Sequence, residues 1–207
     1  GIGQNVQKFD LQLYLRSRFI DKGYKVSQIG TKKISGLFGL HPLPDFLFNT
    51  QYSDVDKVYA FNRVMKDVSM QEKPDVILLG IPDSLLPLNN KHRFSFGLYA
   101  YEIFNAVQPD FVITSLMAND GYNDEFYSEI SKMAKYKYNV NIDAYFVSQF
   151  CPLSNSIWSE KLSYVYLPRM ELPKTEYKVY TTSDLNNDIL FKQAEKKLLL
   201  YGKYEQY

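Results

Sequence analysis

Short apolar runs alternate with longer segments of helical periodicity over the first 150 residues, and this alternation limits the possible folds more than any other feature. The apolar runs lie at 24–29, 76–79, 111–113 and 142–147, and two of them directly follow a Pro-Asp pair. Strands that are separated by helices usually pair in parallel through right-handed crossovers. The sequence therefore predicts an α/β domain with three layers and one mainly parallel sheet.

The pattern changes after residue 150, where regular alternation is lost. We expect residues 1–150 to form the α/β domain and residues 151–207 to form a C-terminal extension packed on the same domain. Within the extension, edge strands are predicted at 162–167 and 177–181, and a terminal helix over 187–201.

Composition excludes several classes of protein. The 207 residues carry a formal net charge of +1, without the basic excess typical of nucleic-acid binders. No apolar run approaches the ~18 residues that a membrane helix needs. The single cysteine, Cys151, excludes an internal disulfide framework, and two unpaired histidines predict no metal-ligand cluster. We expect a cytoplasmic protein with neither a nucleic-acid nor a membrane partner.

The opening segment has some of the residues of a phosphate-binding loop. Such a loop needs small residues whose backbone N–H groups surround the anion, a lysine for the phosphates and a following hydroxyl for magnesium. Gly1, Gly3 and Lys8 precede a predicted helix and supply the first two requirements. Gln7 stands before the lysine, and Phe9 takes the place of the hydroxyl. A second interpretation is a helix start whose turn merely contains glycines.

Two carboxylates are candidate partners for magnesium or for Lys8. Asp10 lies in the first turn of the predicted helix, and Asp83 follows the predicted strand at 76–79. Ligands of open α/β sheets bind beyond the carboxyl ends of the strands, which is where Asp83 is expected. The alternative for Asp83 is a turn aspartate, favoured by Pro82.

Glycine-bearing turns of this kind often follow a buried strand. We therefore expect a strand upstream of Gly1, followed by the loop and the helix.

A third candidate region is the apolar, turn-rich loop at 36–46. It includes Phe38, His41 and Phe46, which are candidates for binding a partner. The alternative is a loop that folds onto the sheet through its leucine and phenylalanine side chains, with His41 as a hydrogen-bonded structural residue.

Several stretches of residues 1–115, taken together, resemble one known family. They are residues 1–3, 8–13, 23–30, 38–41, 73–82, 100–103, 106–107 and 109–110. As a set they resemble the clostridial peptide maturation system proteins, which are encoded beside radical-SAM enzymes and exporters for ribosomally made modified peptides.

The resemblance implies a fold similar to P-loop nucleotide-binding proteins, preceded by a separate N-terminal domain. The family commonly has glycine where this chain has Gln7, and glycine where it has Asp83. Both departures lie where phosphate would sit, so they predict a degenerate phosphate loop with little or no nucleotide hydrolysis.

The functional hypothesis is an accessory protein of a peptide maturation system that binds the peptide precursor or a modifying enzyme. One alternative is an active enzyme that uses ATP or GTP with magnesium, through Lys8 and either Asp10 or Asp83. Another alternative is a structural subunit of an assembly.

Overall fold

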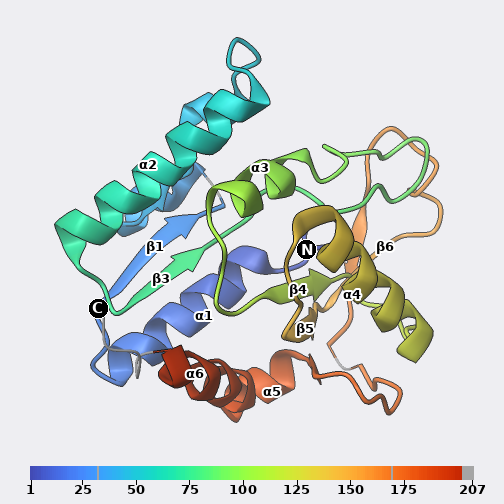
Figure 1. Ribbon diagram of the computed structural model, residues 1–207. Helices are drawn as coiled ribbons and strands as arrows, with labels where there is room; N and C mark the ends of the chain where they lie inside the picture. The colour runs from blue at the N-terminus through green and yellow to red at the C-terminus, as the bar shows by residue number, and fades with distance from the viewer. Residues whose placement is uncertain (32, 169, 202–207) are drawn as a thin grey trace.

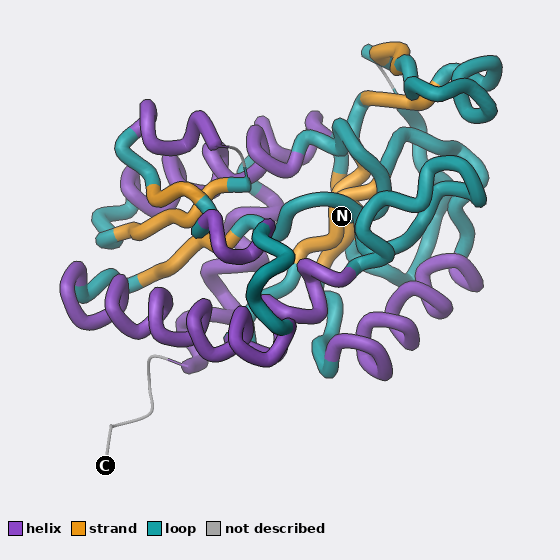
Figure 2. The backbone as a smooth tube through the Cα atoms, turned by 90° about the horizontal axis from the view of Figure 1, so that it is seen from above, coloured by secondary structure: helices purple, strands orange, loops and turns teal. Residues whose placement is uncertain are grey.

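The computed structural model of the protein describes residues 1–31, 33–168 and 170–201. Strands form its middle layer and helices cover both faces (Figure 1). Seen at right angles, the strands gather in separate groups (Figure 2). The α/β class predicted from the sequence is confirmed, and its parallel pairing is confirmed within the two three-stranded groups.

The first group is a three-stranded parallel sheet in the order β2-β1-β3. Its strands are β1 (Val26–Gly30), β2 (His41–Pro42) and β3 (Val76–Leu79). Val26 lies opposite Val76, so β1 and β3 run in register over the whole of β3.

The second group is a three-stranded parallel sheet in the order β4-β5-β8. Its strands are β4 (Ile113–Leu116), β5 (Ala144–Val147) and β8 (Val179–Tyr180). A separate antiparallel pair joins β6 (Phe150–Pro152) to β7 (Tyr164–Tyr166).

Helices α1 (Lys8–Asp21) and α6 (Ile189–Tyr201) cover one face of both sheets. Their apolar side chains share one core cluster with residues of β5, and partly buried residues of β1, β3 and β4 pack against it. The buried members are Leu11, Leu15, Phe19, Ala144, Phe146, Leu190, Phe191 and Ala194. Helix α1 thus packs against strands of both sheets and connects them.

Helices α2 (Asp54–Glu72), α3 (Leu98–Ala106) and α4 (Asp124–Tyr138) cover the opposite face. Ser53 caps the N-terminus of α2, because its hydroxyl accepts a hydrogen bond from the Asp56 N–H at 3.2 Å. The remaining helical segments are η1 (Lys33–Phe38), η2 (Asp45–Phe48) and α5 (Thr182–Asn186).

Three details differ from the sequence predictions. One continuous sheet was expected, but the described strands form two parallel sheets. We call β3 and β4 the inner strands, because each is the end strand of its sheet on the side that faces the other sheet. The continuous apolar run of β3 predicts a strand buried on both faces, but its four residues are only half-buried, because one edge of the strand borders a cavity. Helical spacing predicts that Val55 and Tyr59 share the face of α2 that carries Met65 and Val68, but they are 62% and 72% exposed.

The C-terminal part contributes the edge strand β8 and the helix α6 to the domain. Strand β8 pairs in parallel with β5, and α6 packs on the same face as α1. The strand expected at 111–113 begins at Ile113, and Phe111 instead packs against the core cluster of α1 and α6.

Candidate phosphate-binding loop

The opening segment lies at the carboxyl ends of the two inner strands. The Ile2 N–H donates to the Ser115 carbonyl of β4 at 2.8 Å, and Ile2 forms a parallel bridge with Leu116. On the other side, the Leu85 N–H donates to the Gly1 carbonyl at 2.8 Å. The carboxyl ends of parallel strands are where open α/β sheets bind ligands.

The backbone of this loop alternates between left-handed and ordinary conformations. Gly3, Asn5 and Gln7 have φ angles of 99°, 53° and 52°. Ile2, Gln4 and Val6, which alternate with them, do not have positive φ angles. Alternation of left-handed and right-handed residues is typical of a nest, in which successive N–H groups point toward one concave side that can hold an anion, so residues 3–8 are a candidate nest.

Most N–H groups of residues 3–8 have no hydrogen-bond acceptor among the described residues. Gly3 is an exception, since its N–H donates to the Ser84 hydroxyl at 2.8 Å. No other described residue accepts a hydrogen bond from the N–H groups of Gln4, Asn5, Val6, Gln7 and Lys8. Gln4 and Asn5 are also exposed, so the nest is open to solvent.

Lys8, the first residue of α1, follows the candidate nest directly in the chain. Its ammonium group donates to the backbone carbonyl of Asp83. Burial lowers the pKa of Lys8 to about 8, although the negative charge of Asp83 acts in the opposite direction. A bound anion would therefore favour the protonated form of Lys8 and be favoured by it.

Asp83 takes part through its carbonyl, while its carboxylate is occupied elsewhere. The carboxylate accepts hydrogen bonds from the Ser95 N–H at 2.7 Å and from the Ser95 hydroxyl. Sequence reasoning missed Ser95, because nothing in the spacing of the two residues signals that their loops meet. Asp10 is exposed on α1.

Gln7 keeps the backbone shape that glycine adopts most easily. Its φ of 52° is left-handed, which costs a non-glycine residue about 1–2 kcal/mol. Its side chain turns toward residue 149, since Oε1 accepts a hydrogen bond from the Gln149 N–H at 2.8 Å. Residue 7 thus has a left-handed backbone although it is not glycine.

These residues fit an anion better than a magnesium ion. Phe9 stands at the position where a phosphate loop supplies a hydroxyl for magnesium. The Asp83 carboxylate is bound to Ser95, and within the described chain no group of three or more His, Cys, Asp or Glu residues could hold a metal ion.

The loop at 36–46 divides into an outward and an inward part. Phe38 is 57% exposed, and its ring meets the Phe9 ring edge-on with centroids 6.0 Å apart. His41 instead forms a contact of 2.5 Å with Glu72, which also accepts a hydrogen bond from Ser27. The Ser27 hydrogen bond, followed by the interaction with His41, holds the pKa of Glu72 below its usual value.

Phe46 belongs to the inward part. It is half-buried and packs against the core cluster of α2 and α3. Of the three partner-binding candidates, only Phe38 is therefore largely exposed.

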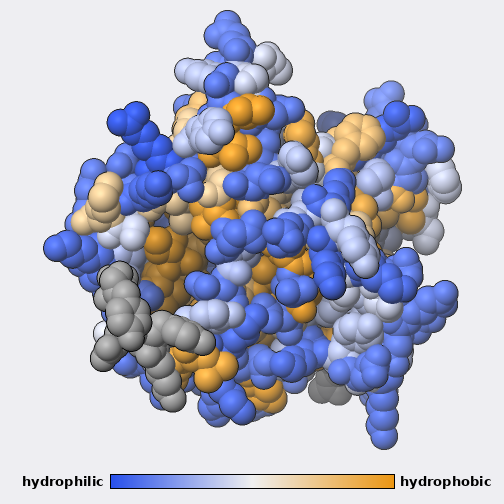
Figure 3. All heavy atoms as spheres, viewed as in Figure 1, coloured by the Kyte–Doolittle hydropathy of each residue, from blue (hydrophilic) through white to orange (hydrophobic). Residues whose placement is uncertain are grey.

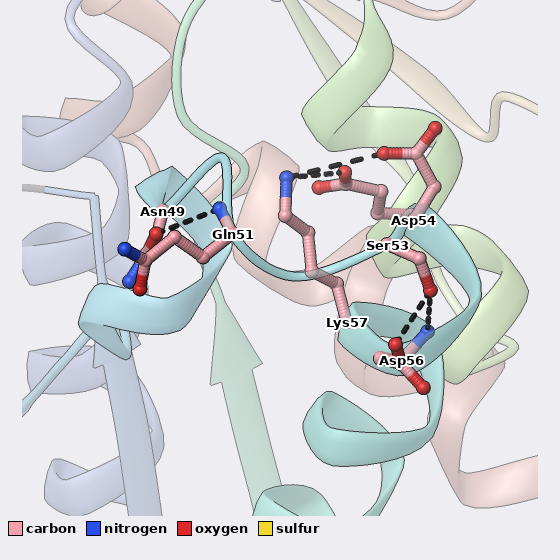
Figure 4. A network of polar contacts seen from close by, with 7 residues as sticks. Asn49, Gln51, Ser53, Asp54, Asp56 and Lys57 are labelled. Carbon is pink, nitrogen blue, oxygen red and sulfur yellow. Dashed lines mark hydrogen bonds and ion pairs between the residues drawn. The ribbon is translucent and has the colours of Figure 1, made fainter.

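A buried ion pair joins the start of α2 to α3, and sequence reasoning did not find it (Figure 4). Lys57 Nζ lies 3.2 Å from Glu102 Oε1 and 3.9 Å from Asp54 Oδ1. Burial raises the pKa of Glu102, and Lys57 opposes that rise. This pair connects two helices on the face opposite α1, so its evident contribution is to their packing.

No family model matches the chain, and a search of curated proteins also finds no match. Among the described helices, none combines the length and the apolar character needed to cross a bilayer.

Proposed function

We propose that this chain is a binding protein built on a P-loop-like domain, in which the opening loop holds a phosphate-type anion without efficient nucleotide turnover. The single observation that supports this proposal best is the nest at residues 3–8, where left-handed residues alternate and consecutive N–H groups lack partners among the described residues. Lys8 adds a cation directly after these residues in the chain, and its ammonium group reaches the Asp83 carbonyl beyond the end of β3.

The expected lack of turnover follows from the groups around the nest. Phosphoryl transfer depends on electrostatic stabilisation, and losing one well-placed group costs ~10²–10³ in rate. Phe9 offers no hydroxyl, and the Asp83 carboxylate already accepts two hydrogen bonds from Ser95. An ATP- or GTP-dependent enzyme is the competing function, and it would need a magnesium ligand that these residues do not supply.

We further propose that the bound partner is the peptide precursor or the modifying enzyme of a peptide maturation system. The resemblance over residues 1–115 suggests this partner class. Leu37 and Phe38 supply an apolar surface for it, since they are 86% and 57% exposed. The contact between Phe38 and Phe9 places this surface beside the helix that follows the nest.

The anion-binding part is tested by calorimetric titration with pyrophosphate, Mg-ATP and Mg-GTP, alongside an assay of phosphate release. We expect binding that Lys8→Ala weakens strongly and Lys66→Ala leaves unchanged, because Lys66 is an exposed lysine on α2. We expect no phosphate release above background. Robust release that Lys8→Ala abolishes would replace the proposal with the enzymatic alternative.

The partner-binding part is tested by fluorescence anisotropy with the precursor peptide encoded beside the gene, and by co-purification with the modifying enzyme. Phe38→Ser should weaken binding. Tyr136→Ser is the matched control, since Tyr136 is 82% exposed on α4. Equal effects of the two substitutions would contradict the assignment of the surface.

A further inference from the structure

The inner strands β3 and β4 each have one edge without a strand beside it among the described residues. Strand β3 ends the order β2-β1-β3, and β4 ends the order β4-β5-β8 (Figure 1). In a parallel ladder the backbone groups of alternate residues point to opposite sides. The Val76 N–H donates to the carbonyl of Lys25, the residue before β1, and the Gly80 N–H donates to the carbonyl of Ile29 in β1. Ile77 and Leu79, which alternate with these donors, therefore direct their N–H and C=O groups away from β1.

The same alternation applies to β4. The carbonyls of Val112 and Leu116 accept hydrogen bonds from the β5 side, so those of Ile113 and Ser115 point away from β5. The carbonyl of Ser115 is already used in this direction, since it accepts the Ile2 N–H.

A cavity of about 550 Å³ separates the two edges. All of β3 lines it, and so do Ile113, Thr114 and Ser115 of β4. Apolar residues of α1 and α6 line one face of the cavity, and Met65 and Phe104 line the other. Figure 3 shows an apolar recess in the surface over the region of β3.

The cavity explains the unusual exposure of β3. Strand β5, which pairs on both edges, has four buried residues, whereas all four residues of β3 are half-buried. A run of Val-Ile-Leu-Leu is typical of a strand covered on both faces and both edges. An apolar strand edge left open is also a site for pairing with another strand.

We propose that the gap between β3 and β4 holds one further parallel β-strand, and that this strand is the segment of the same polypeptide that leads directly into Gly1. It would join the two sheets into one, in the order β2-β1-β3, new strand, β4-β5-β8.

The contacts of Gly1 and Ile2 determine the direction and register of this strand. Ile2 runs parallel to β4 opposite Leu116, and its N–H binds Ser115. Traced backwards, the residue before Gly1 lies opposite Thr114 and donates to the Ile113 carbonyl. The Gly1 carbonyl already bonds on the β3 side, to Leu85, as the alternation requires. The chain at Gly1 therefore has the position and direction of the end of a central strand.

The lining determines the chemistry of the strand. Since helices cover both faces of the cavity, successive side chains of the strand meet apolar surroundings. We expect a continuous apolar run rich in β-branched residues rather than alternating polar and apolar positions. About five residues at ~3.3 Å each span the length of β3 and β4.

The test attaches a Val-Ile-Val-Ile-Val segment directly before Gly1. Matched controls carry Gly-Ser-Gly-Ser-Gly or Val-Ile-Pro-Ile-Val at the same position. The apolar segment should raise the midpoint of thermal unfolding by about 5 °C or more. It should slow hydrogen exchange of the Ile77 and Leu79 amides by about 10²-fold. The Leu78 amide points toward β1 and serves as the internal reference.

The Gly-Ser and proline segments should produce neither change. If the 207-residue chain fails to fold without an extension, folding that only the apolar segment restores also supports the proposal. Equal behaviour of the apolar and Gly-Ser segments would overturn it.

Two further outcomes would also overturn it. If a separate partner supplies the strand, the same apolar peptide, added as a free molecule with two lysines for solubility, would protect the Ile77 and Leu79 amides as strongly as the attached segment does. Concentration-dependent dimers with the same protection would show that a second copy covers the edges.

Discussion

The opening loop was predicted to bind phosphate, and the loop at 36–46 was predicted to bind a partner. The two loops differ in which part of the chain defines their structure. The opening loop is defined by its backbone, because left-handed residues at Gly3, Asn5 and Gln7 orient its N–H groups. The loop at 36–46 is defined by side chains, of which Phe38 points outward while His41 and Phe46 are engaged in internal contacts.

The difference shows which substitutions matter in each region. A loop defined by its backbone tolerates a change of side chain as long as the residue can adopt the required φ, as Gln7 does. A surface defined by side chains depends on which of them are exposed, and composition does not reveal that. The first region is therefore probed with glycine substitutions, and the second with truncations of aromatic residues.

The largest expected contrast is between Gly3→Ala and Gly39→Ala. Both glycines have positive φ, 99° and 67°, but a Cβ at Gly3 would lie 2.7 Å from Met117, whereas a Cβ at Gly39 meets nothing within 4 Å. Gly3→Ala should lower the free energy of unfolding by about 3 kcal/mol, and Gly39→Ala by about 1 kcal/mol. Urea denaturation measures both, and equal losses would contradict the close packing of the opening loop.

The next effect is a pH dependence that belongs to the opening loop. Burial lowers the pKa of Lys8 from 10.5 to about 8, so the unfolded chain binds more protons between these values. Stability should therefore rise as pH increases from about 8 to 10.5, by about 2 kcal/mol. Lys8→Met should remove this rise. If the free energy of unfolding depends on pH in the same way in the unmodified protein and in Lys8→Met, the Lys8 ammonium group is not buried.

A smaller contrast lies within the loop at 36–46. Phe46→Ala should lower the free energy of unfolding by about 1–2 kcal/mol, because Phe46 packs against a core cluster. Phe38→Ala should cost less than about 1 kcal/mol, since it removes little more than the edge contact with Phe9. A larger loss for Phe38 in thermal unfolding would mean that this residue supports the fold rather than an interaction surface.

The smallest effect compares Gln7→Gly with Gln7→Ala. Both substitutions remove the hydrogen bond to the Gln149 N–H, but only glycine relieves the cost of the left-handed backbone. Gln7→Gly should be more stable than Gln7→Ala by about 1 kcal/mol. Chemical denaturation of the two variants would contradict the proposed loop conformation if alanine proved as stable as glycine.

Much of the fold could be predicted from periodicity. The strand at 76–79 and the helices on either side of it follow from apolar spacing, and the Ser53 cap follows from its hydroxyl. The edge strand expected at 177–181 is present as β8, but its parallel pairing with β5 could not be predicted, since a strand of two residues carries no periodic signal. The unpaired edge of β3 could not be predicted either, because the apolar sequence of a strand is the same whether or not a neighbouring strand is present.

The candidate site was predictable only in its residue types. Gly1, Gly3 and Lys8 do lie together at the ends of β3 and β4, as the motif implies. The left-handed conformation of Asn5 and Gln7 and the pairing of Asp83 with Ser95 depend on tertiary contacts. These contacts bear on the chemistry, since they occupy the Asp83 carboxylate, while the N–H groups of residues 4–8 have no acceptor among the described residues.

The central claim, that the opening loop and Lys8 bind a phosphate-type anion together, is tested most directly by proton uptake on binding. Lys8 has a pKa of about 8, so half of the free protein lacks this charge near that pH. Titration with pyrophosphate at pH 8 in two buffers of different ionisation enthalpy measures the protons taken up. The account predicts uptake of about half a proton at Lys8, absent in Lys8→Met. Binding without uptake, or uptake unchanged in Lys8→Met, would contradict it.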